Sequence, residues 1–162
     1  MKWINLISLS IFVWLLQLLL SDSFSINTVR PDFCVILILY WSLTYGRTFG
    51  ICSGFLFGLV LDLSSSSIFF GLSPITYTIT GYLVGGLSKN RARLNPFYFS
   101  LSWVAILFFQ FFVYCSVQYQ DLWEINRQIF WGKWLGTSIY TISFVAVLQF
   151  IYPLNKIDNV KS

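Results

Sequence analysis

The chain has 162 residues, of which 57% are hydrophobic and only 10% are charged, and its mean hydropathy is +0.73. A soluble domain needs a polar surface, and about a quarter of the residues in typical soluble proteins are charged, so this composition excludes an ordinary soluble fold. The net charge of +4 comes from basic residues scattered at the ends of apolar segments, which excludes a nucleic-acid-binding face and is typical of topology signals.

In chain order, the apolar segments predict an all-α integral membrane protein with about six transmembrane helices in a single polytopic domain, residues 1–162. Each crossing needs about 20 residues, so six crossings leave room only for short loops and tails. The first segment lacks a good signal-peptide cleavage site, and we expect it to be retained as a helix. The predicted helices cover residues 3–20, 31–45, 48–63, 70–87, 97–117 and 131–152, the second and third being short.

The second and third segments are predicted to form a hairpin, although they could also be read as one long helix. With the hairpin, seven basic residues lie on one side of the bilayer and three on the other, as the positive-inside rule requires. Both termini are then cytoplasmic. The inner set is Lys2, Arg47, Lys89, Arg91, Arg93, Lys156 and Lys161, and the outer set is Arg30, Arg127 and Lys133.

The sequence offers little chemistry for catalysis. It contains no His, and its three cysteines, Cys34, Cys52 and Cys115, are widely separated within apolar runs, so no disulfide framework or metal-binding spacing is indicated. No nucleophile elbow or phosphate-binding loop is present either. We therefore expect no enzyme activity, no cofactor and no metal.

The third predicted helix carries Gly46, Gly50, Gly54, Gly58 and Asp62 at four-residue spacing, which forms one slowly drifting stripe on a helix. Each glycine costs up to about 1 kcal/mol against alanine in an isolated helix, so four in register need a reason. Small residues let helix backbones touch in lipid, where hydrophobicity contributes little to association. The alternative is that membrane helices merely tolerate glycine. We predict a helix-packing interface, with a partner pair on the fourth helix, Gly81 and Gly85.

Asp62 continues this stripe at the outer end of its helix. Three roles are open: a proton or ion carrier, a buried hydrogen-bond acceptor that fixes the following turn at residues 64–67, or a solvated carboxylate among lipid headgroups. Asp32 is predicted at the same outer level, beside Pro31 at the start of the second helix. The two carboxylates could share a structural polar cluster with Arg30.

Several of these residues occur in the order and spacing of a known family signature. The chain resembles the MreD family of bacterial rod shape-determining membrane proteins over residues 30–87. The turn after Asp62 departs from the Ser-Gly-Ser that is common in that family, because this chain has four serines there. The matching residues are Pro31, Asp32, Tyr40, Trp41, Gly54, Phe55, Gly58, Asp62, Ser64, Gly71 and Tyr82.

The resemblance implies a non-enzymatic scaffold subunit of the cell-elongation machinery that makes peptidoglycan. Its implied partners are MreC and, indirectly, MreB, RodA and a class B penicillin-binding protein, besides membrane lipid. The implied fold is similar to the substrate-binding membrane subunits of energy-coupling-factor transporters. The alternative function is a small transporter or substrate-capture subunit. That alternative needs a polar cavity, for which the apolar segments offer few candidates, namely Asn5, Gln17, Gln110 and Gln149.

Overall fold

The structure, a computed structural model, describes residues 2–23, 30–64, 69–90 and 95–151. Within these ranges the protein is all-helical, with seven helices and no strand, which confirms the predicted all-α class but not the predicted number of membrane crossings. The helices are α1 (Lys2–Ser23), α2 (Phe33–Tyr45), α3 (Arg47–Ser64), α4 (Leu72–Asn90), α5 (Pro96–Gln118), α6 (Gln120–Ile125) and α7 (Arg127–Ile151).

Local signals in the sequence explain where α2 begins and ends. Asp32 is its N-cap, and the Asp32 carboxylate accepts a hydrogen bond of 3.1 Å from the backbone N–H of Val35, as is typical of the first turn of a helix. Pro31 and Asp32 therefore precede the helix rather than forming its first turn. Gly46 ends α2 with a φ of +87°, a conformation that glycine adopts without strain, and α3 begins at the next residue.

Helix α2 is the buried centre of the protein. Nine of its thirteen residues are buried, and it contacts α1, α3, α4 and α7. The most extensive contact in the fold joins α3 to α4. Because the side chains of α2 are apolar on every face, the helix is stable only when other helices surround it. The buried apolar core is centred on α2 and includes side chains of α3, α4, α5 and α7.

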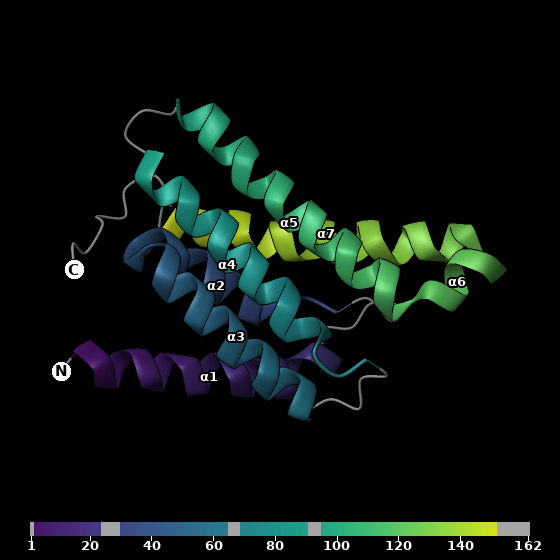
Figure 1. Ribbon diagram of the computed structural model, residues 1–162, viewed down its shortest axis with the longest axis horizontal. Helices are drawn as coiled ribbons and strands as arrows, with labels where there is room; N and C mark the ends of the chain where they lie inside the picture. The colour runs from purple at the N-terminus through teal and green to yellow at the C-terminus, as the bar shows by residue number, and fades with distance from the viewer. Residues whose placement is uncertain (1, 24–29, 65–68, 91–94, 152–162) are drawn as a thin grey trace.

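Helices α5, α6 and α7 form the other side of the bundle (Figure 1). Helix α6 is a short element that hydropathy did not predict, and α7 begins at Arg127 rather than at residue 131. The cause is the polar residue between them: the Asn126 side chain accepts hydrogen bonds from the backbone N–H groups of Gln128 and Ile129, at 3.2 and 3.4 Å. An Asn cap therefore starts α7 one turn before the apolar run.

The described helices alternate in direction along the long axis. Figure 1 shows the beginning of α1, the α2–α3 turn, the end of α4, the beginning of α5 and the end of α7 at one end of the protein. The end of α3, the beginning of α4 and the short α6 lie toward the opposite end. Arg47 and Lys89 therefore share one end, and Asp62, Asp121 and Arg127 lie toward the other.

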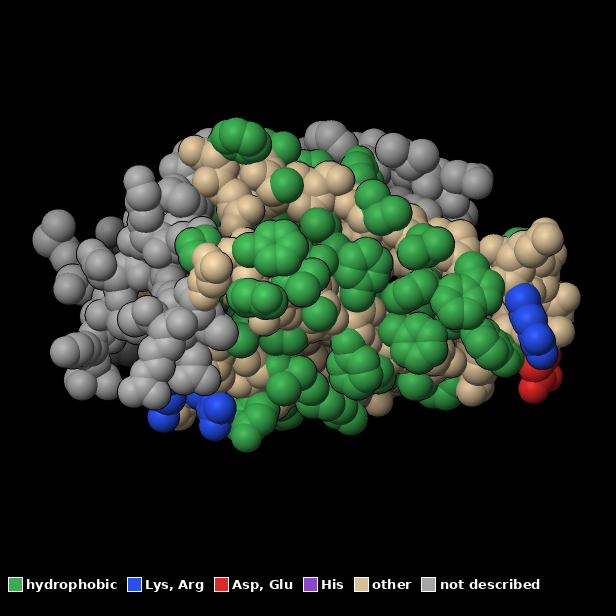
Figure 2. Space-filling view, turned by 90° about the horizontal axis from the view of Figure 1, so that it is seen from above, with side chains coloured by type: hydrophobic (Ala, Val, Ile, Leu, Met, Phe, Trp, Pro, Cys, Tyr) green, Lys and Arg blue, Asp and Glu red, His purple; other side chains and the backbone are tan. Residues whose placement is uncertain are grey.

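The surface carries a wide apolar belt. Figure 2 shows hydrophobic side chains over the middle of one face, with the coloured basic and acidic side chains near the two ends. Among the described residues, two helices are long and apolar enough to cross a membrane by length and composition, namely α3 and α5. Shorter apolar helical stretches cover Ser8–Leu19 and Phe33–Tyr45.

Candidate functional site

The α3–α4 contact is made by backbone meeting backbone at five glycines. A methyl group placed on Gly54 would lie 2.5 Å from the carbonyl oxygen of Tyr77, well inside ordinary van der Waals contact. A methyl group on Gly50 would lie 2.7 Å from the carbonyl oxygen of Gly81, and one on Gly58 would lie 2.6 Å from the carbonyl carbon of Ser73. Only glycine fits such an approach. We call this interface the glycine seam, formed by Gly50, Gly54 and Gly58 on α3 and by Gly81 and Gly85 on α4.

The four-residue spacing predicts that Gly46 belongs to the helix-packing interface, but the structure places it elsewhere. It lies in the turn before α3, its φ is +87°, and a methyl group there would meet no atom within 4 Å. It is a turn residue that needs the left-handed conformation, whereas the glycines of the seam need space. Gly85 lies at the other end of the seam, where a methyl group would lie 2.8 Å from the backbone nitrogen of Arg47.

Asp62 ties the end of the seam to the start of α4. Its side chain is only 4% exposed, and its Oδ2 atom accepts a hydrogen bond of 2.6 Å from the backbone N–H of Gly71. Gly71 has a φ of +98° and precedes α4. The Oδ1 atom of Asp62 has no hydrogen-bond partner in the described part of the chain. Residues 65–68, which include most of the predicted serine turn, lie outside the described residues.

Asp32 is the meeting point of side chains from several helices. Its carboxylate accepts a hydrogen bond from the Tyr77 hydroxyl of α4, and its backbone N–H donates to the Thr141 hydroxyl of α7 over 3.2 Å. Gln17 of α1 completes this group: its amide nitrogen donates to the carbonyl oxygen of Pro31 and its amide oxygen accepts from the backbone N–H of Phe33, at 3.3 and 2.7 Å. We call Asp32, Tyr77, Thr141 and Gln17 the polar node.

The seam and the polar node are physically connected. Tyr77 supplies the backbone carbonyl that packs on Gly54 and also the hydroxyl that reaches Asp32. Burial raises the pKa of the Asp32 carboxyl from 3.8 to about 6, although the hydrogen bonds from Tyr77 and from the backbone act in the opposite direction. Asp32 and Asp62 thus make the hydrogen bonds described above to different residues, and a shared cluster with Arg30 stays a prediction.

The four aromatic residues of the family signature fall into two groups. Trp41 is 7% exposed and belongs to the core, and Tyr40 is half-buried against it. Phe55 and Tyr82 lie on the surface, at 49% and 46% exposure, and the guanidinium of Arg47 lies 4.4 Å from the centre of the Tyr82 ring. Their exposure leaves them available to lipid or to a partner.

Sequence reasoning missed Tyr77 and Thr141, and it considered Gln17 only as a candidate for a polar cavity. Tyr77 had a signal, because it lies four residues before Gly81 and therefore extends the glycine spacing of α4 by one step. Gln17 and Thr141 had none, since their partners are far away in the chain. Gln110, another candidate for a polar cavity, is 4% exposed, and its amide has no partner within the described ranges. No group of three or more possible metal ligands occurs among the described residues.

Comparison with known protein families identifies the relatives of the chain. The family model of the rod shape-determining protein MreD matches residues 1–155. This chain belongs to the MreD family. The match covers nearly the whole chain, whereas the sequence resemblance rested on residues 30–87, and it confirms that resemblance. No match is found among curated proteins or among solved structures.

Membership of the MreD family assigns the chain to the membrane proteins that determine rod shape in bacteria. It is a family of structural membrane proteins, which agrees with the apolar belt and with the two helices that are long enough to span. The glycine seam and the polar node are therefore candidate elements of a shape-determining membrane protein.

Proposed function

We propose that the chain is a non-enzymatic scaffold subunit of the bacterial cell-elongation machinery, and that it binds MreC. Through MreC it is linked to MreB, RodA and a class B penicillin-binding protein during peptidoglycan synthesis. The observation that carries the proposal is the MreD family match over residues 1–155. The family description concerns cell shape, and a shape-determining subunit without its own catalytic groups acts by holding other proteins together.

The internal packing supports a rigid scaffold. At the glycine seam, α3 and α4 touch through backbone atoms. Their packing therefore costs little side-chain conformational entropy. The polar node then fixes α1, α4 and α7 to the start of α2 through hydrogen bonds. A bundle held in this way presents its outer side chains in constant positions, which is what a docking partner needs.

We further propose that the protein is a multi-pass inner-membrane protein whose helices other than α6 cross the bilayer, with both termini in the cytoplasm. The support is that Arg47 and Lys89 lie at one end of the bundle and Asp62 and Asp121 toward the other. A similarity to the substrate-binding subunits of energy-coupling-factor transporters remains part of this proposal.

Affinity capture from membranes tests the scaffold directly. Cells whose only copy of the protein carries a tag are solubilised in mild detergent, and co-purified MreC is quantified for the wild type, Gly54→Leu and Gly58→Leu. We expect both variants to lose MreC and the cells to lose rod shape. Gly132→Leu is the matched control, because a methyl group on Gly132 meets no atom within 4 Å. Normal MreC capture and normal rods with both seam variants would contradict the proposal.

The transporter alternative receives less support from the described residues. The large cavity there is lined almost wholly by apolar side chains, whereas a polar substrate needs convergent hydrogen-bonding groups. Uptake that saturates with substrate, by purified protein in liposomes, would favour that alternative.

A further inference from the structure

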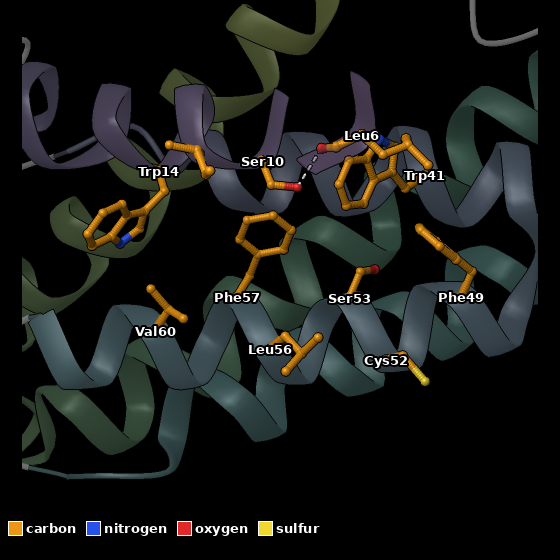
Figure 3. Close-up of a pocket in the computed structure, with 11 residues that line it drawn as sticks. Leu6, Ser10, Trp14, Trp41, Phe49, Cys52, Ser53, Leu56, Phe57 and Val60 are labelled. Carbon is orange, nitrogen blue, oxygen red and sulfur yellow. Dashed lines mark hydrogen bonds between the residues drawn. The ribbon is translucent and has the colours of Figure 1, made fainter. Parts of the chain in front are cut away.

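A groove of about 450 Å³ runs between α1 and α3, with α2 as its floor (Figure 3). Its walls are large apolar side chains from all three helices. Helix α3 borders it from Phe49 to Val60, a distance of about 16 Å at 1.5 Å per residue. The wall residues that define its length are Leu6 and Trp14 of α1, Trp41 of α2, and Phe49, Phe57 and Val60 of α3.

The two hydroxyls that line the groove make internal hydrogen bonds, whereas one buried polar atom is an exception. The hydroxyl of Ser10 donates to the carbonyl oxygen of Leu6, and the hydroxyl of Ser53 donates to that of Gly50, at 2.7 and 3.2 Å. The exception is the indole Nε1 of Trp14, which is buried and has no acceptor in the described part of the chain. Figure 3 shows the Trp14 ring at one end of the groove, beside Val60. A buried indole N–H usually has a partner, so an acceptor is missing at this end.

We propose that the groove binds one acyl chain of a membrane phospholipid, whose ester carbonyl accepts a hydrogen bond from Nε1 of Trp14. The groove is continuous with the outer face of α3, where the lining residues Leu56 and Val60 are 61% and 37% exposed. Helix α3 is long and apolar enough to cross a membrane, so this face meets lipid. An ester carbonyl lies at the edge of the hydrocarbon layer in a free bilayer. Val60 lies about 6 Å before the end of α3, so the bound lipid sits deeper in the groove than its neighbours in the bilayer.

The size of the groove selects an acyl chain over a helix. One water occupies about 30 Å³ of liquid, and a methylene group is of similar size, so the groove of about 450 Å³ holds roughly 15 methylenes. A helix with side chains is about 10 Å wide, so it would lie along the open side of the groove rather than fill it. The groove therefore fits a single hydrocarbon chain.

A photoreactive phospholipid tests the proposal. The full chain is placed in nanodiscs of phosphatidylethanolamine that contain a small share of phosphatidylethanolamine with a diazirine in one acyl chain. After illumination, labelled peptides are mapped by mass spectrometry. We expect labels to concentrate on groove residues of α1 and α3 rather than on the exposed faces of α5 and α7. The Trp14→Phe variant, which keeps the ring but not the donor, should lower groove labelling about two- to ten-fold.

Filling the groove provides the second arm. Ser10→Phe should abolish groove labelling, because Figure 3 shows the Ser10 side chain directed into the groove. Ser143→Phe is the matched control: Ser143 also donates to the carbonyl four residues earlier, but it is exposed on α7. Circular dichroism checks folding, and Ser10→Leu replaces Ser10→Phe if the larger residue unfolds the protein. Labelling spread evenly over the lipid-facing helices would overturn the proposal. Unchanged groove labelling in the filled variant would also overturn it. So would a disulfide between the exposed Cys52 residues of two chains, because it would show that a second copy of the protein covers the groove.

Discussion

Adding a single methyl group to the glycine seam should separate α3 from α4. At Gly54 the new carbon would lie 2.5 Å from the carbonyl oxygen of Tyr77, and ordinary contact begins at 3.4 Å, so the helices must move apart by about 1 Å. Overpacking of this kind typically costs about 1–3 kcal/mol. Alanine returns up to about 1 kcal/mol of helix propensity. We expect Gly54→Ala to lower the free energy of unfolding by about 1–2 kcal/mol.

The assay is unfolding of the purified protein in mixed micelles by increasing dodecyl sulfate, followed by circular dichroism. Gly132→Ala is the control, because its methyl group meets no atom within 4 Å and it gains only helix propensity. The seam variant should therefore unfold earlier than wild type, and the control at the same point or later. Equal unfolding of Gly54→Ala and Gly132→Ala would refute the account of the seam.

Three further predictions concern the polar groups. Because the pKa of Asp32 is raised to about 6 in the fold against 3.8, the fold binds more protons than the unfolded chain between these values. This contribution to the free energy of unfolding is complete below about pH 4. It is lost as the pH rises through 6, which lowers the free energy of unfolding by about 3 kcal/mol. Thermal unfolding at a series of pH values measures the change. The Asp32→Asn variant should flatten this dependence, and a wild-type curve that rises over the same range would contradict the assigned burial. Asp62→Ala removes the acceptor of the Gly71 N–H, and we expect unfolding to become easier by about 1–3 kcal/mol, whereas Asp62→Asn retains an acceptor and loses less. Equal losses in the two variants would show that this hydrogen bond is not the cause. Gln17→Leu removes both hydrogen bonds from α1 to the start of α2, so protease should cleave the released α1 faster than in Leu16→Ala, a neighbouring control.

Much of the fold was predictable because the hydropathy pattern indicates which segments avoid water. The all-helical class and the family followed from long apolar runs and from the order of residues such as Pro31, Trp41 and Gly71. The short α6 was not predictable in this way, because its six residues mix polar and apolar side chains. Its presence depends on the ends of α5 and α7, which local caps decide.

The candidate site was predictable where it is periodic along one helix. Four-residue spacing identified the glycines of α3 and α4, but it also included Gly46, since spacing alone does not reveal that α2 ends there. The partners of Asp32 could not be found from the sequence. Tyr77 and Thr141 lie 45 and 109 residues away along the chain, and only the packing of α4 and α7 against α2 brings them together.

The most direct test concerns the crossing of α3 as a separate helix that packs on α4. In a Cys52→Ser background, single cysteines are placed at the exposed positions Ser64, at the end of α3, and Asn95, just before α5. Spheroplasts are treated with a maleimide that does not cross membranes. The account predicts that Ser64→Cys reacts at once and that Asn95→Cys reacts only after permeabilisation. Immediate labelling of Asn95→Cys, with Ser64→Cys protected, would contradict it.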